Sequence, residues 1–83
     1  MRNMTLMAFI KRIKEAGVNP RRDIVLKTHR DTYAIEDTLE NGTIKVRDIK
    51  GRNTGSFFIH GFDWGIISVA PVPSLSKVIV RIE

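Results

Sequence analysis

The stretch FFIHGFDWGIISV, from Phe57 to Val69, consists of two apolar arms separated by a short polar centre. Each arm has the length of a buried or half-buried β-strand, which typically runs for about four to eight residues. The centre, HGFDWG, combines two glycines with a histidine and an aspartate, a composition typical of a turn. We therefore predict two strands, at 56–60 and 65–70, that are joined by a tight turn.

The chain on either side of this stretch carries further strand patterns. An Asn-Gly pair at 41–42 stands between two β-like runs and is a strong signal for a hairpin. Prolines at 71 and 73 predict a break in the chain, and the residues after them alternate between the two faces of a final strand. The additional strands are predicted at 24–27, 32–39, 43–49 and 77–83.

The N-terminal segment TLMAFIKRIKEA, residues 5–16, has the pattern of an amphipathic helix. Its apolar residues recur at helical spacing and form one stripe, while charged residues occupy the opposite side. Gly17 suits the position just after a helix, and Asn19-Pro20 prevents the helix from continuing. The stripe consists of Leu6, Phe9, Ile10, Ile13 and Ala16.

One helix followed by five or six short strands predicts a single mainly β (α+β) domain over residues 1–83. We expect a basic amphipathic helix over 1–17 and a β-barrel over 23–83. The barrel is expected to be a small, strongly bent, five-stranded antiparallel one with an extra C-terminal strand. That last strand, 77–83, would either complete its own barrel or pair with a neighbouring subunit.

The net charge of +5 is concentrated near the N-terminus. Residues 1–22 contain Arg2, two lysines and three further arginines against Glu15 alone, whereas basic and acidic residues balance over 23–83. Such asymmetry favours a polyanionic partner, with nucleic acid ahead of anionic lipid, although a solubilising helix face would have the same composition. No apolar run is long enough for a membrane span, and we expect a cytoplasmic protein that does not enter a membrane.

Signals for catalysis are weak. The chain has no cysteine, and its histidines, His29 and His60, lack a ligand partner at helical spacing. The loop GRNTGS, 51–56, lacks the Gly-Lys-Ser/Thr ending of a phosphate loop. We therefore expect no catalytic residues, metal or cofactor, and keep an acid–base pair of His60 and Asp63 only as a minor alternative.

The aromatic residues favour binding instead. Four of them, at 57, 58, 62 and 64, lie within eight positions. One of Phe57 and Phe58 must face the core, because adjacent strand residues point in opposite directions, and the other could lie in a subunit interface. Phe62 and Trp64 in the turn could stack on unpaired bases, each stack contributing about 1–3 kcal/mol. Alternatively, Trp64 plugs the end of the barrel below the helix.

These elements resemble the Sm/LSm family, which includes bacterial Hfq. The segment Phe58-Ile59-His60-Gly61 is similar to the Ile-Arg-Gly at the end of the fourth Sm strand, and 65–71 resembles the Ala-Ile-Ser-Thr-Val-Val-Pro that closes the Hfq core. Residues 25–27, 33 and 39–46 match the first Sm motif more loosely. A histidine replaces the usual arginine, two residues are added in the turn, and Asn41 is the nearest substitute for the family's base-binding asparagine.

The resemblance implies a non-enzymatic homo-oligomeric ring of about five to seven copies that binds single-stranded RNA, or possibly DNA, and takes part in its processing or regulation. In this family the fourth strand of one subunit pairs with the fifth strand of the next. The implied interface residues are Phe57, Phe58, Ile59, Ile66, Ile67 and Val69. The predicted nucleic-acid-binding residues are His60, Trp64, Asn41, Lys11, Arg12, Lys14, Lys50 and Arg52. The alternative is a small β-barrel module that binds other proteins and no nucleic acid.

Overall fold

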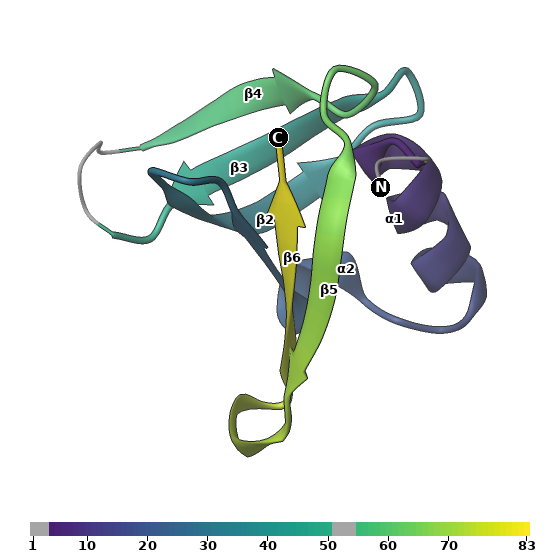
Figure 1. The fold of residues 1–83 in the computed structure, drawn as a ribbon. Coiled ribbons are helices and arrows are strands. Elements are labelled where there is room, and N and C mark those ends of the chain that lie inside the picture. The colour runs from purple at the N-terminus through teal and green to yellow at the C-terminus, as the bar shows by residue number, and fades with distance from the viewer. Residues whose placement is uncertain (1–3, 51–54) are drawn as a thin grey trace.

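A six-stranded β-sheet with one helix packed against it forms most of the protein (Figure 1). The computed structural model describes residues 4–50 and 55–83. The prediction of a mainly β fold with an N-terminal helix is confirmed. The strands are β1 (Ile24–Lys27), β2 (Thr32–Thr38), β3 (Thr43–Asp48), β4 (Ser56–His60), β5 (Ile66–Val72) and β6 (Lys77–Ile82).

The helix α1 (Leu6–Glu15) begins where the sequence predicts. The Thr5 side chain caps its first turn by accepting a hydrogen bond from the Ala8 amide at 3.1 Å. A second, four-residue helix, α2 (Pro20–Asp23), was not predicted from the sequence. Asn19 caps it through the Arg21 amide at 3.0 Å, and Pro20 fits the first helical position, so Asn-Pro both ends one helix and begins another.

The order of the strands is β4-β3-β2-β1-β6-β5, so β4 and β5 are the edges of an open sheet. The extra C-terminal strand pairs within its own chain, since β6 lies between β1 and β5. It runs parallel to β1 and antiparallel to β5, and the sheet is therefore mixed. The predicted break at 71–74 comes later, because β5 passes through Pro71 and ends before the 3₁₀ turn η1 (Pro73–Leu75). An edge strand tolerates proline when the missing amide faces away from the sheet.

The core lies between α1 and the face of the sheet that α1 covers. Every second residue of β1, β3 and the end of β6 points into it, as expected from the alternation of strand side chains. Its fully buried side chains are Leu6, Ile10, Leu26, Ile44, Val46, Val80 and Ile82. Each such burial contributes about 1.5–3 kcal/mol, which holds a marginal ten-residue helix in place.

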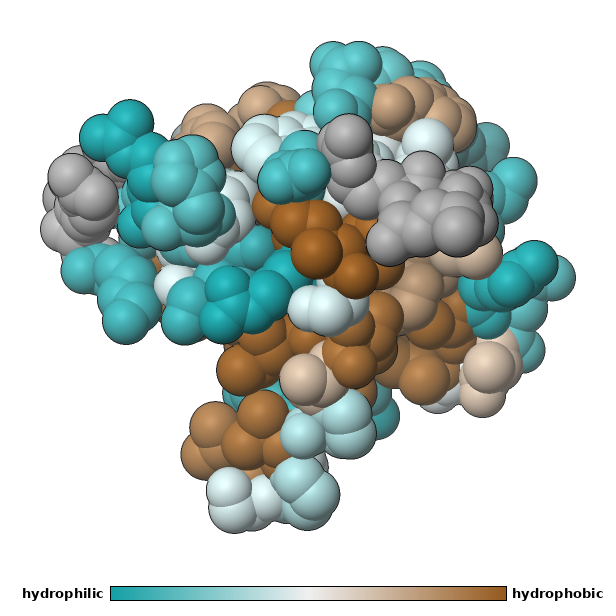
Figure 2. All heavy atoms as spheres, in the orientation of Figure 1, coloured by the Kyte–Doolittle hydropathy of each residue, from teal (hydrophilic) through white to brown (hydrophobic). Residues whose placement is uncertain are grey.

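Not all apolar side chains reach this core. Along β5 the five residues from Ile67 to Pro71 are exposed, and Leu75 in η1 is 63% exposed. The space-filling view shows apolar surface over the centre of the molecule and down the β5–β6 hairpin to its tip (Figure 2). The C-terminal half of the sheet thus leaves an uncharged edge in solvent.

Candidate nucleic-acid interface

Two turns that are distant in the sequence lie against each other. The first joins β2 to β3 and contains Gly42, and the second joins β4 to β5 and covers residues 60–65. The Gly61 amide donates to the Gly42 carbonyl at 2.7 Å. A Cβ atom on Gly42 would lie 2.4 Å from Cε2 of Phe62, so the ring occupies the space that glycine leaves free. We call these two turns the turn pair.

The N-terminus of α1 closes over the turn pair. The Leu6 amide donates to the Trp64 carbonyl at 2.8 Å, and the Met7 amide donates to the Gly61 carbonyl at 3.1 Å. These bonds use amides that a helix N-terminus leaves without intrahelical partners. Trp64 itself is half-buried and packs against the core, as the alternative interpretation of this residue expects.

Three rings line the β4 side of the sheet and continue into the turn pair. Phe58 is 60% exposed and Phe62 is 53% exposed. His60, which lies between them in the sequence, is also exposed. The rings of His60 and Phe62 are 5.5 Å apart between centroids. Phe58 and His60 share one face of β4, because Phe57 and Ile59 turn toward the core. We call Phe58, His60 and Phe62 the aromatic row.

Asn41 lies in the same turn as Gly42, beside the end of the aromatic row. Its side-chain oxygen accepts a hydrogen bond from the Thr43 amide at 3.0 Å and so holds the turn. This leaves the amide group of Asn41 as the donor that can reach a ligand. Of the predicted binding residues, His60 and Asn41 therefore lie close together in the structure. Phe62, which was not among the predicted binding residues, lies beside them.

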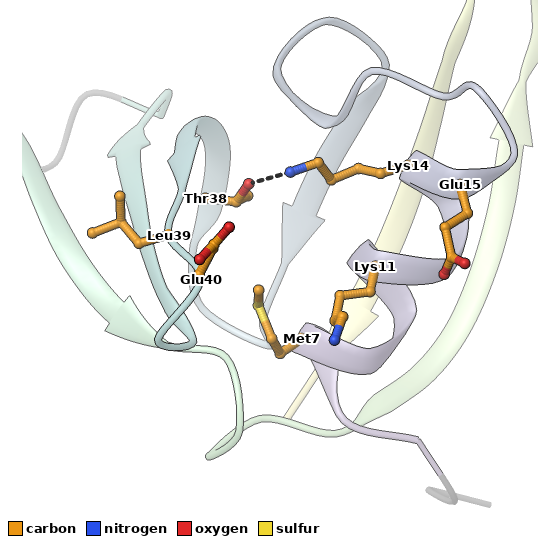
Figure 3. A pocket seen from close by; sticks show the side chains of 7 residues that line it. All are labelled: Met7, Lys11, Lys14, Glu15, Thr38, Leu39 and Glu40. Atoms are coloured by element: carbon orange, nitrogen blue, oxygen red, sulfur yellow. Dashed lines mark hydrogen bonds between the residues drawn. The ribbon is translucent and has the colours of Figure 1, made fainter.

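The basic residues of α1 lie on the other side of the turn pair. Lys11, Arg12 and Lys14 are all exposed. Lys11 and Lys14 line a cleft of about 530 Å³ between α1 and the β2–β3 turn (Figure 3). Lys14 Nζ donates to Thr38 Oγ1 at 3.1 Å across this cleft, and the carboxylate of Glu40 lies on the same side as Thr38. The helix side of the cleft therefore carries two lysines and the acidic Glu15, and the opposite side carries Glu40.

The other predicted binding residues lie in the connection from β3 to β4. Lys50 is exposed, and its amide donates to Oδ1 of Asp48 at 2.9 Å. The second oxygen of this buried Asp48 has no hydrogen-bond partner among residues 4–50 and 55–83. Arg52 lies outside the described residues.

The predicted interface residues divide into two groups. Phe57 faces the core and makes an edge-on contact with Tyr33, with ring centroids 5.3 Å apart. Ile59 and Ile66 also pack partly against the core. The exposed group consists of Phe58, Ile67 and Val69 on the two edge strands.

The binding residues predicted from the sequence do not include several cations. These cations lie on the face of the sheet that is turned away from α1. Lys45 and Arg47 alternate with the buried Ile44 and Val46 on β3. The same alternation places Arg81 on the outer face of β6, because its neighbours Val80 and Ile82 are buried. Alternation in each predicted strand was the signal that could have identified these residues, whereas their shared face depends on the strand order.

Comparisons with known proteins give no relative: no protein-family model matches the chain, and neither a curated protein nor a solved structure resembles it significantly. Within the described ranges, no helix is both long and apolar enough to cross a membrane. Nor do residues 4–50 and 55–83 contain a group of three or more histidine, cysteine or acidic side chains that could hold a metal ion.

Proposed function

We propose that this protein binds single-stranded nucleic acid, RNA or DNA, and does so as an assembly of identical copies. The observation that carries the proposal is the aromatic row, in which Phe58, His60 and Phe62 are exposed and Phe58 lies opposite Lys45 of β3. Exposed rings stack on unpaired bases of any sequence, and neighbouring cations attract the phosphates. The basic face of α1 would add long-range attraction for a polyanion.

Self-assembly is supported by the two open edges. The Ile66 amide already donates to the Met4 carbonyl at 3.0 Å, so the open part of β5 before Pro71 is the four residues 67–70, beside a β4 of five residues. No charged side chain lies within either segment, and an open apolar edge is a ready template for pairing with another strand. Pairing β4 of one copy with β5 of the next would cover both edges and, as in the Sm proteins that the sequence resembles, close a ring.

Ring closure and nucleic-acid binding are compatible at Phe58. Pairing at a sheet edge uses backbone groups, while side chains remain on the two faces of the extended sheet. The outward face of β4 would therefore stay open, and each copy would present its own aromatic row. A ring of about five to seven copies would repeat the row and the surrounding positive charge.

Anisotropy titrations with labelled oligo-U, oligo-A and single-stranded DNA test the proposal. We expect saturable binding to all three that weakens steeply as the salt concentration rises, because phosphate contacts release counterions. A duplex of the same length should bind more weakly, since its bases are not available for stacking. Absence of saturable binding at low salt would rule the function out.

A second candidate is a module that binds another protein through its edge strands. It is favoured by the exposed apolar side chains of β5 and η1, where Ile67, Val69 and Leu75 are 43%, 45% and 63% exposed. Such edges also accept extended peptides. Replacement of Lys11, Arg12 and Lys14 by glutamine separates the two candidates, since it should weaken nucleic-acid binding for all sequences alike and leave binding of a protein partner intact.

A further inference from the structure

A groove that contains three arginines lies between α2 and the outward face of β2 and β3. Its volume is about 330 Å³. Ala34 and Arg47 are cross-strand partners on this face, since their neighbours Ile35 and Val46 are buried. The groove is lined by Arg21, Arg22, Ala34, Ile35, Glu36 and Arg47.

The three guanidinium groups differ in how far they are neutralised. Arg22 donates to both oxygens of Asp23, at 2.8 and 3.1 Å, and this pairing lowers the pKa of that carboxyl group. Nε of Arg47 lies 3.5 Å from Oε2 of Glu36, a looser contact. The Arg21 side chain has no acidic partner among the described residues. Arg21 and Arg47 therefore keep donors that can bind an oxyanion.

Glu36 limits the positive charge of the groove. Its carboxylate accepts a hydrogen bond from Ser56 Oγ of β4 and also faces Arg47. An incoming phosphate would compete with Glu36 for Arg47, because both anions are attracted to the same planar guanidinium group. Arginine suits this exchange, since its fork of donors binds carboxylate and phosphate in the same geometry.

The groove is continuous with the aromatic row. Arg47 lies opposite Ser56, and Lys45 lies opposite Phe58 in the β3–β4 ladder. Successive side chains on one face of a strand are about 7 Å apart. One step along β4 thus leads from the groove to Phe58, and a second step leads to His60.

We propose, as an extension of the proposed function, that this groove binds a backbone phosphate of the same single strand whose bases stack on Phe58 and His60. The strand then runs along β3 and β4 on the face turned away from α1. Arg21 and Arg47 hold the phosphate, Lys45 holds the next one, and Glu36 weakens binding by competing for Arg47. The groove recognises phosphate and not base identity, so it serves RNA and DNA alike.

The test compares single substitutions in anisotropy titrations with labelled oligo-U and oligo-dT over a range of salt concentrations. Arg21→Gln and Arg47→Gln should each weaken binding by about three- to ten-fold and reduce the salt slope by about one. Arg30→Gln is the matched control, because it removes the same charge from an exposed site outside the groove. Glu36→Gln should strengthen binding by about two- to five-fold, since it keeps a hydrogen-bond acceptor for Ser56 and removes the competing charge.

The outcomes separate this inference from the function on which it rests. If Arg21→Gln and Arg47→Gln behave like Arg30→Gln while Phe58→Ala weakens binding, the protein binds nucleic acid by another path and the groove is not a phosphate site. An unchanged or lowered affinity of Glu36→Gln contradicts the competition by Glu36. If the wild-type protein binds neither oligonucleotide, both the function and the groove are wrong. Circular dichroism of each variant checks that the substitutions, all at the surface, leave the fold intact.

Discussion

Gly42 and Phe62 pack so closely that a side chain at residue 42 would have to displace the aromatic ring. A Cβ atom there would be 2.4 Å from Cε2 and 2.6 Å from Cδ2 of Phe62. The same glycine has a φ of +96°, which disfavours any residue with a Cβ atom. Through this contact the β2–β3 turn fixes the end of the aromatic row, so the shape of the proposed base-binding surface depends on a backbone position.

Gly42→Ala should therefore cost more stability than an alanine at another left-handed glycine. Gly17→Ala is the matched control, because Gly17 has a φ of +90° and no atom within 4 Å of an added Cβ. We expect Gly17→Ala to lower the free energy of unfolding by about 1–2 kcal/mol and Gly42→Ala by about 2–4 kcal/mol. Urea denaturation measures both values. Equal losses would mean that the Phe62 ring does not depend on Gly42.

Substitutions of Trp64 and Phe58 should have different effects, the first on stability and the second on nucleic-acid binding. Trp64 packs against the core, and Trp64→Ala is expected to lower the free energy of unfolding by about 2–3 kcal/mol. Phe58 is largely exposed, so Phe58→Ala should change stability by less than about 1 kcal/mol. It should nevertheless weaken oligonucleotide binding about five-fold or more through the loss of one stack. A stable Trp64→Ala variant that loses binding would reverse the two assignments.

Tyr33 gives a pH-dependent test of the fold. Burial, together with the charge and hydrogen bond of Asp31, raises the pKa of its hydroxyl group above the ordinary value near 10. A raised folded-state pKa means that this contribution to stability is complete below pH of about 10 and is lost as the pH rises through the folded pKa. Tyr33 is the only tyrosine, so phenolate absorbance reports it directly.

Two substitutions control the Tyr33 measurement. Asp31→Asn should move the titration toward its ordinary value, because the charge that opposes phenolate formation is gone. Tyr33→Phe should remove the tyrosine titration together with the part of the alkaline stability loss that it causes. Titration at an unperturbed pKa in the wild-type protein would contradict the burial of this ring.

The open edge of β5 predicts how assembly can be blocked. Val69 is 45% exposed in the part of β5 that precedes Pro71, and a lysine at an edge strand opposes pairing with another strand. Val69→Lys should therefore shift the protein toward monomer in light scattering, with a loss of stability below about 1 kcal/mol. Ser74→Lys adds the same charge at an exposed site in η1. This control should leave the oligomeric mass measured by light scattering unchanged. An oligomer unaffected by Val69→Lys would place the interface elsewhere.

Local patterns in the sequence predict the elements of this fold well. The helix, the Asn-Gly hairpin and the strands around 56–70 follow from apolar spacing and turn residues that lie within a few positions of each other. The insertion of β6 between β1 and β5 could not be predicted in this way, because parallel pairing joins residues more than fifty positions apart. The helix α2 was not predicted either, because Asn19-Pro20 was interpreted only as the end of the first helix. In the structure the same pair also begins α2.

The candidate site was only partly accessible to the same reasoning. His60 and Asn41 could be chosen because turns often carry polar ligand-binding residues. Two other features depend on how the two turns pack together. These are the contact between the rings of Phe62 and His60, and the packing of Trp64 against the core. The arginine groove combines α2, β2 and β3, so no single segment of the sequence indicates it.

The most direct test of the central claim is native mass spectrometry of the protein alone and with an equimolar single-stranded 20-nucleotide oligo-U. We predict one oligomeric species of about five to seven copies that gains the mass of one oligonucleotide. Phe58→Ala should keep the oligomeric mass and lose the bound oligonucleotide as the salt concentration rises. A monomer whose mass is unchanged by oligo-U would contradict the account.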